Sequence, residues 1–205
     1  MDIRVLRYIR YASIGLIALL VFASLAVGLG WLQSGQRQSA TLSGDGPKIA
    51  AFNLIDQKNT QVSEKDIVGK PAVLFFGFGY CPDVCPTTLA DLTGWLGRLG
   101  SDADRLGVFF VTVDPERDTP DELAKYLSSF DSRIRGLTGA PDQIAALGKS
   151  LGVYYAKVQT GNGSYTMDHT SSMFLLDAQG RIVGTIPYGE NKDEALAKLR
   201  QLAAL

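Results

Sequence analysis

The stretch 72–86 reads AVLFFGFGYCPDVCP, and it contains both a predicted strand and the only two cysteines of the chain. Its first five residues, 72–76, are apolar and partly β-branched or aromatic, and a proline and a glycine bound them. This pattern predicts a buried central strand. A turn rich in glycine and proline follows and carries Cys81 and Cys85. Leucines then recur at spacings of three and four over 89–99, so a helix ending at a glycine should come next.

The rest of the region 48–205 alternates between strand-like and helix-like periodicity. Further strands are expected at 49–54, 60–62, 108–113, 153–158, 173–176 and 182–186. Further helices are expected from Thr119 to about Phe130, over 141–151 and from Asn191 onward. The first two strands should form a hairpin, and the last should lie at a sheet edge. The pattern predicts an α/β domain with helices packed on a central sheet.

Length and composition narrow the class of protein. A chain of 205 residues has room for one globular domain and an appendage. Its formal net charge of −1 provides no field that would attract a polyanion, so no nucleic-acid partner is expected. Two cysteines four positions apart cannot form a disulfide framework. Their closeness in the sequence indicates a chemical role rather than a disulfide that stabilises the fold.

The N-terminal segment is predicted to anchor the protein in a membrane. Residues 12–32 carry no charge, and this length of helix matches the thickness of a bilayer core. Arg4, Arg7 and Arg10 precede the segment, which places residues 1–11 in the cytoplasm and the domain outside it. We therefore expect a single-pass protein with a periplasmic or otherwise extracytoplasmic C-terminal domain.

A cleaved signal peptide is the alternative, because Ser24 and Ala26 have the small-residue spacing that signal peptidase reads. The apolar run continues past that point, which favours the uncleaved helix. Residues 33–47 are rich in Ser, Gly and Gln and read as a flexible linker. The folded domain is then expected at 48–205.

The cysteines lie where the predicted strand gives way to the predicted helix. Free N–H groups at a helix N-terminus stabilise thiolates, and the thiolate is the form that binds metals and attacks disulfides. Spaced four apart, the sulfurs of Cys81 and Cys85 can bind one soft metal or form a disulfide. A pair of inert buried cysteines is the third interpretation, which the turn-forming glycines and prolines around them disfavour.

His169 is the only histidine, and it stands just before the predicted strand 173–176. Together with two thiolates, an imidazole gives a three-coordinate site that suits copper, whereas structural zinc normally requires four protein ligands. Asp168 is a candidate to orient the ring. Asp83 is interpreted as a helix cap rather than a fourth ligand.

The segment Asp114-Pro115-Glu116-Arg117-Asp118-Thr119-Pro120 follows the predicted strand 108–113 and should lie at the same sheet edge as the cysteines. It is either a solvated loop with a helix cap or a support for the site.

Three motifs, FGFGYCPDVCP at 76–86, VTVDPERDTP at 111–120 and Asp-His-Thr at 168–170, resemble the Sco/SenC family of copper chaperones for cytochrome c oxidase. The resemblance covers roughly 48–205 and keeps the order of the motifs. Tyr80 departs from the family, because many members have histidine there. The resemblance implies a thioredoxin-like central sheet with flanking helices and an N-terminal β-hairpin, preceded by one transmembrane helix.

The resemblance also implies that a copper ion is bound by Cys81, Cys85 and His169. The implied partner is cytochrome c oxidase subunit II or another copper acceptor, whose copper-A centre would receive copper or have its cysteines reduced. On this interpretation the protein is a carrier rather than an enzyme. A membrane-anchored thiol:disulfide oxidoreductase with Cys81 and Cys85 as a redox-active disulfide is the alternative, although the Cys-x-x-x-Cys spacing differs from thioredoxin-type motifs. A peroxide-reducing enzyme fits paired thiols least well.

Overall fold

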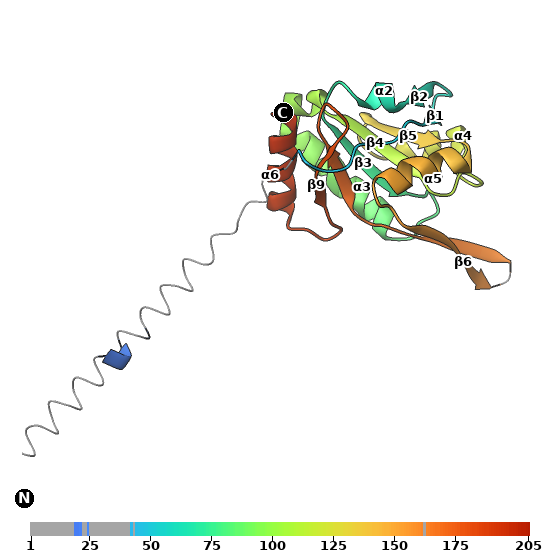
Figure 1. The fold of residues 1–205 in the computed structure, drawn as a ribbon. Helices are drawn as coiled ribbons and strands as arrows, with labels where there is room; N and C mark the ends of the chain where they lie inside the picture. Colours follow the sequence, from blue (N-terminus) through green and yellow to red (C-terminus); the bar gives the residue numbers. More distant parts are fainter. Residues whose placement is uncertain (1–18, 22–23, 25–41, 43, 162) are drawn as a thin grey trace, which may run out of the picture. The chain divides into compact units, whose positions relative to one another are not determined.

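The computed structural model of the protein describes residues 19–21, 24, 42, 44–161 and 163–205 (Figure 1). The chain forms two compact units that divide between Thr41 and Leu42. The predicted cytoplasmic segment 1–11, the membrane helix 12–32 and the linker 33–47 lie almost wholly outside the described residues. Among the residues that are described, no helix is long and apolar enough to cross a membrane.

Seven strands form the central sheet of the second unit, in the order β2-β1-β5-β4-β3-β8-β9. Their bounds are β1 Asn53–Asp56, β2 Gln61–Ser63, β3 Ala72–Gly77, β4 Gly107–Thr112, β5 Ile134–Thr138, β8 Met173–Leu176 and β9 Ile182–Ile186. The β3, β4 and β5 strands are parallel, and the strands toward both edges run antiparallel to their neighbours. The predicted N-terminal hairpin is confirmed as β1 and β2, and the predicted edge strand is β9.

The β3 strand lies inside the sheet between β4 and β8, and all six of its residues are buried. Its aromatic side chains meet those of the parallel neighbour, with Phe75 opposite Phe110. A run of apolar residues without alternation therefore marks a strand covered on both faces, as predicted. This strand delivers the chain to the cysteine turn.

Helices flank the sheet, as predicted. They are α2 Glu64–Ile67, α3 Val84–Leu99, α4 Pro120–Leu127, α5 Pro141–Ser150 and α6 Lys192–Ala203, and the 3₁₀ turn η1 Gly100–Arg105 follows α3. The Thr119 hydroxyl caps α4 by accepting a hydrogen bond from the Glu122 amide, and Asn191 caps α6 in the same way. The α3 helix packs against α6, whereas α4 contacts β5 and α5 contacts β1.

A second, two-stranded sheet consists of β6 Tyr155–Gly161 and β7 Ser164–His169, and Figure 1 shows it extending from the main sheet. The sequence predicted a strand at 153–158 but not β7, and it also missed β5. In β5 an arginine and a glycine interrupt the expected alternation, whereas β7 alternates but contains few strongly apolar residues. The hairpin pairs Tyr155 with His169 at its base, so it brings the histidine back to the body of the domain.

Candidate metal centre

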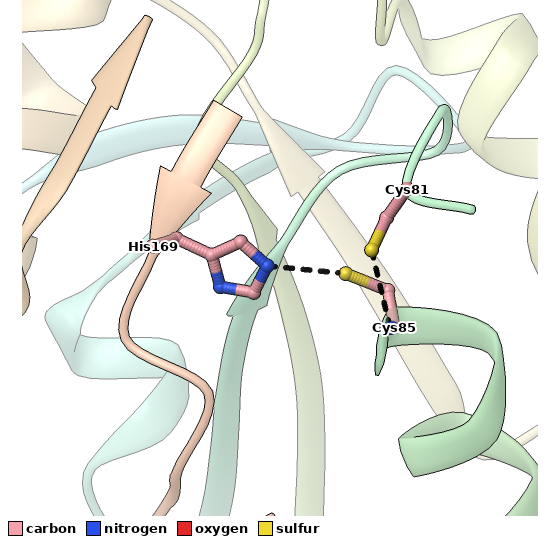
Figure 2. A group of neighbouring side chains, drawn as sticks. All are labelled: Cys81, Cys85 and His169. Atoms are coloured by element: carbon pink, nitrogen blue, oxygen red, sulfur yellow. Dashed lines mark hydrogen bonds between the residues drawn. The ribbon is translucent and has the colours of Figure 1, made fainter. Parts of the chain in front are cut away.

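The structure brings Cys81, Cys85 and His169 together (Figure 2). Cys81 lies in the turn after β3, Cys85 lies in the first turn of α3, and His169 is the last residue of β7. One potential ligand atom from each residue lies within 4.8 Å of the others. Of the described residues, these three alone form a group of this kind among His, Cys, Asp and Glu.

The Cys81 sulfur occupies the N-terminus of α3. The Cys85 amide donates a hydrogen bond to Cys81 Sγ over 3.3 Å. Asp83 stands at the N-cap position, but its side chain accepts no capping hydrogen bond, so the predicted role of that carboxylate is wrong. The Cys81 sulfur takes an N–H group that Asp83 was expected to take, because the turn places it closer to the first helical amides.

The pKa values of the two thiols are shifted in opposite directions. The hydrogen bond from the Cys85 thiol lowers the pKa of Cys81, and contacts with His169 and two backbone amides add to this effect against the cost of burial. The same hydrogen bond, together with burial, raises the pKa of Cys85. Cys81 is therefore the more acidic thiol of the pair and Cys85 the less acidic one.

Cys85 is fully buried, and its sulfur lies directly against the end of β3. A Cβ atom at Gly77 would stand 2.9 Å from Cys85 Sγ and 2.8 Å from the Phe110 ring. Only glycine leaves room for the sulfur at this point. The sequence marked this glycine as a strand boundary, and no local signal revealed its contact with the sulfur.

His169 points its Nε2 atom toward the cysteine sulfurs. Its Nδ1 lies 3.0 Å from the Thr170 carbonyl oxygen, which can only accept a hydrogen bond, so Nδ1 carries the proton. The Nε2 atom faces the cysteines and lies 3.3 Å from Cys85 Sγ. The backbone carbonyl, rather than the exposed Asp168, orients the ring, so the expectation for Asp168 is wrong. The edges of Phe75 and Phe78 also contact the ring.

One side of the site is open. A depression of about 330 Å³ is lined by Cys81 and His169 together with residues of the cysteine turn and of the hairpin base. Cys85 closes the opposite side against the core. A group on another molecule can therefore reach Cys81 and His169 more easily than it can reach Cys85.

The segment 114–120 lies beside the cysteine turn, as one of its two interpretations predicted. The buried carboxylate of Asp118 accepts hydrogen bonds from the Gly79 amide over 2.9 Å and from the Thr112 hydroxyl. Burial raises the pKa of Asp118. This carboxylate fixes the turn two residues before Cys81 and so supports the site from the side of β4.

Two sulfur donors and one imidazole nitrogen form a soft donor set. Such a set suits copper(I), and it suits copper(II) when another ligand joins. Structural zinc sites normally have four protein ligands. The donor set therefore fits copper better than structural zinc.

A mixed sheet with flanking helices and a paired-thiol turn at the end of its central strand defines a thioredoxin-like protein with a candidate metal centre. Residues 40–204 match the family model described as SCO1/SenC, and the chain belongs to this family.

Curated and solved relatives agree with this assignment. The mitochondrial protein SCO2 of Saccharomyces cerevisiae is 36% identical over 154 residues. That match covers 73% of this chain and 51% of the yeast protein, so the chain spans about half the length of this relative. The copper-bound structure of Bradyrhizobium japonicum ScoI is similar with a TM-score of 0.71 and 44% identity, covering 76% of this chain and 99% of that one. Yeast Sco1 with copper bound gives a TM-score of 0.70 at 32% identity, covering 76% and 87%.

Proposed function

We propose that this protein is a copper-binding metallochaperone in which Cys81, Cys85 and His169 hold one copper ion. The observation that carries the proposal is the convergence of their ligand atoms within 4.8 Å from a turn, a helix and a distant hairpin. Solved members of the same family with copper bound support the choice of metal. The protein then carries copper as cargo and is not an enzyme.

The arrangement suits loading and release by ligand exchange. The pKa of Cys81 is lowered, so this thiol ionises readily, whereas the pKa of Cys85 is raised, so Cys85 must release a proton when it binds a metal. The open side allows thiolates of an acceptor to approach Cys81 and His169 first. We propose that the acceptor is the copper-A centre of cytochrome c oxidase subunit II, in keeping with the resemblance to Sco chaperones.

We also propose that the domain 48–205 is tethered outside the cytoplasm by the uncleaved helix 12–32 through the linker 33–47. The uncharged length of that segment and the three preceding arginines support this topology. Carbonate extraction of membranes tests it. The full chain should stay in the membrane pellet, and its release into the supernatant would favour a cleaved signal peptide.

A thiol:disulfide oxidoreductase that reduces cysteines of a partner remains the second candidate. The observation that favours it is the unequal pair itself, the more acidic Cys81 thiol beside the less acidic Cys85. In such a reaction the Cys81 sulfur attacks one sulfur of a partner's disulfide, which breaks the partner's S–S bond, expels its other sulfur as a thiolate and forms a mixed disulfide. The Cys85 thiol then loses its proton and attacks Cys81 Sγ, which releases the partner's thiol and leaves this protein oxidised.

Copper(I) binding to the reduced domain distinguishes the two candidates. Anaerobic competition with a chromophoric chelator compares the wild type with Cys85→Ser and His169→Ala. One tightly bound equivalent, weakened strongly by each substitution, is the expected result. Tight binding that is indifferent to His169, or weak binding by the wild type, would reject the three-ligand site and favour thiol exchange.

A further inference from the structure

Arg117 lies where three segments of the domain meet. Its guanidinium stands 3.9 Å from the ring centre of Tyr165 on β7, and 4.9 Å and 5.8 Å from the rings of Tyr80 and Phe78 in the cysteine turn. It belongs to the loop 113–119 between β4 and α4. One side chain thus contacts both the segment that carries the cysteines and the strand that carries His169.

Polar contacts fix the guanidinium in this position. Arg117 forms an ion pair with Asp114, and its Nη1 donates a hydrogen bond to the Tyr165 carbonyl oxygen over 3.1 Å. The Tyr165 hydroxyl donates to the other Asp114 oxygen over 2.9 Å. The Asp114 side chain is only 2% exposed, so its charge needs these partners. The planar fork of arginine can serve a carboxylate, a carbonyl and an aromatic face at once, and lysine cannot.

Tyr165 and His169 lie on the same face of β7. They are four residues apart, and side chains at i, i+2 and i+4 of a strand share a face. Met167 between them is buried, whereas Ser164 and Asp168 on the other face are exposed. Holding Tyr165 against the domain therefore holds the inner face of the strand that ends in the imidazole.

Phe78 provides a second, shorter link. Its ring centre lies 5.8 Å from the Arg117 guanidinium and 5.8 Å from the centre of the His169 ring. The guanidinium therefore holds Phe78, which packs against the imidazole, as well as the strand β7, which carries His169. Both routes lead from Arg117 to the ring and bypass the cysteine sulfurs.

Apart from Arg117, the hairpin is held by apolar packing of Met167 and Tyr155 against the core and by weaker polar contacts. Five of the seven β6 residues are exposed, and the hairpin belongs to no larger sheet. At the outer surface, Lys157 pairs with Glu116 over 2.7 Å, but solvent screens such an exposed pair. At the base, the Thr170 amide and the Tyr154 carbonyl are bonded over 2.9 Å. The buried charge and the ring stacking at Arg117 thus join the hairpin to the cysteine turn where its other polar contacts are exposed or lie within the hairpin.

We propose that Arg117 is a positioning residue that holds β7, and with it the His169 imidazole, at the distance from the cysteine sulfurs that copper binding needs. The inference rests on the proposed copper site, and it concerns how that site is assembled. Residues that orient metal ligands typically contribute about 10- to 100-fold in metal affinity. Arg117 should act chiefly on the nitrogen ligand, because the ring nearest to it is that of Tyr165, on the strand that carries His169.

The test compares Arg117→Met with the matched control Arg135→Met. Arg135 has the same chemistry, an ion pair of 2.9 Å with the buried Asp56 and a position over the Phe109 ring, but it lies on β5 and contacts no part of the hairpin. Copper(I) affinity should fall about 10- to 100-fold in Arg117→Met and stay within about twofold of the wild type in Arg135→Met. Tyr165→Leu leaves the Arg117–Asp114 ion pair in place and should also weaken copper(I) binding. This second variant tests the positioning role even if Arg117→Met fails to fold.

Two further readouts separate positioning from a general loss of structure. In the His169→Ala background, Arg117→Met should cause no additional loss of affinity, because the ligand through which it acts is gone. In the copper(II) complex of Arg117→Met, the nitrogen hyperfine coupling seen by electron paramagnetic resonance should weaken.

Three results would contradict either the proposed function or the positioning role of Arg117. A wild-type affinity that does not depend on His169 would reject the proposed function. A wild-type affinity that depends on His169 but is unchanged in Arg117→Met and Tyr165→Leu would overturn the positioning role alone. A full additional loss in the Arg117→Met, His169→Ala double variant would also overturn it, since Arg117 would then act on the whole domain.

Discussion

The two halves of the site are built in different ways. The sulfurs lie at the end of β3, a strand with all six residues buried between two neighbours, and at the start of a 16-residue helix. The imidazole lies at the end of β7, in a separate two-stranded sheet whose other strand is largely exposed. The sulfurs are therefore fixed by the core of the domain, and the imidazole is fixed by a few side-chain contacts.

This difference assigns different roles to the two halves. Displacing the sulfurs requires rearranging a close-packed core, which costs stability of the whole domain. Displacing the imidazole requires only that the contacts of the hairpin loosen, and local openings of this kind cost less than global unfolding. At the proposed copper site, the hairpin side can therefore loosen, and so change affinity or allow release, without unfolding of the domain.

The largest effect is expected from Gly77→Ala, which attacks the sulfur side. The new methyl group would stand 2.9 Å from Cys85 Sγ and 2.8 Å from Phe110, so the sulfur and the ring must both move. Overpacking of this kind typically lowers the free energy of unfolding by about 1–3 kcal/mol. Denaturant unfolding should show this loss, and copper(I) competition should show weaker binding by the same variant.

Gly97→Ala is the matched control for that substitution. Gly97 lies in the last turn of α3, and a Cβ atom there meets nothing within 4 Å. Alanine is favoured over glycine in a helix by up to about 1 kcal/mol, so this variant should be slightly more stable and should bind copper normally. If Gly77→Ala and Gly97→Ala have the same free energy of unfolding, the packing around the cysteine sulfurs is not rigid.

The pH dependence of copper binding tests the protonation of the two thiols in the copper-free protein. Cys81 has a lowered pKa and Cys85 a raised one. Binding to both thiolates therefore releases one proton, from Cys85. Affinity should rise with pH by about tenfold per unit between about pH 7 and 9. Competition titrations should give a slope near one, whereas a slope near two would show that both thiols are protonated in the free protein.

The sequence predicted the sulfur half well because that half follows general rules. An apolar run without alternation marks a doubly covered strand, and helices were correctly expected to begin at Thr119 and Asn191. The cysteine turn was correctly placed between β3 and α3. The three proposed ligands also meet as expected, although their role as copper ligands stays a prediction.

The hairpin half was harder to predict, and the reason is physical. Its strands bury little, so the alternation that reveals a strand is weak, and β7 was missed. Asp168 was chosen to orient the histidine, but a backbone carbonyl does so, and every residue has one. Arg117 and Tyr165 are 48 positions apart, and no local pattern links an arginine to a ring at that separation.

A smaller effect is expected from Thr170→Val at the base of the hairpin. The Thr170 hydroxyl accepts a hydrogen bond from the Tyr154 amide over 3.0 Å, next to the carbonyl that orients His169. Loss of one such hydrogen bond costs about 0.5–1.5 kcal/mol. Because this contact closes only the hairpin, copper(I) affinity should fall about two- to tenfold while the denaturation midpoint hardly moves. A large shift of the midpoint with unchanged affinity would contradict the local role of the hairpin base.

The smallest effect is expected from Val158→Thr on the outer part of β6. Val158 is 37% exposed, and threonine keeps its shape and β-branching, so the free energy of unfolding should change by less than about 0.5 kcal/mol. The same substitution at Val73, which is fully buried on β3, adds a hydroxyl to the core and should cost about 1–3 kcal/mol. Denaturant unfolding of the two variants measures the contrast between the halves directly. If Val158→Thr destabilises the domain as much as Val73→Thr does, the hairpin unfolds together with the core, and affinity cannot be tuned on one side alone.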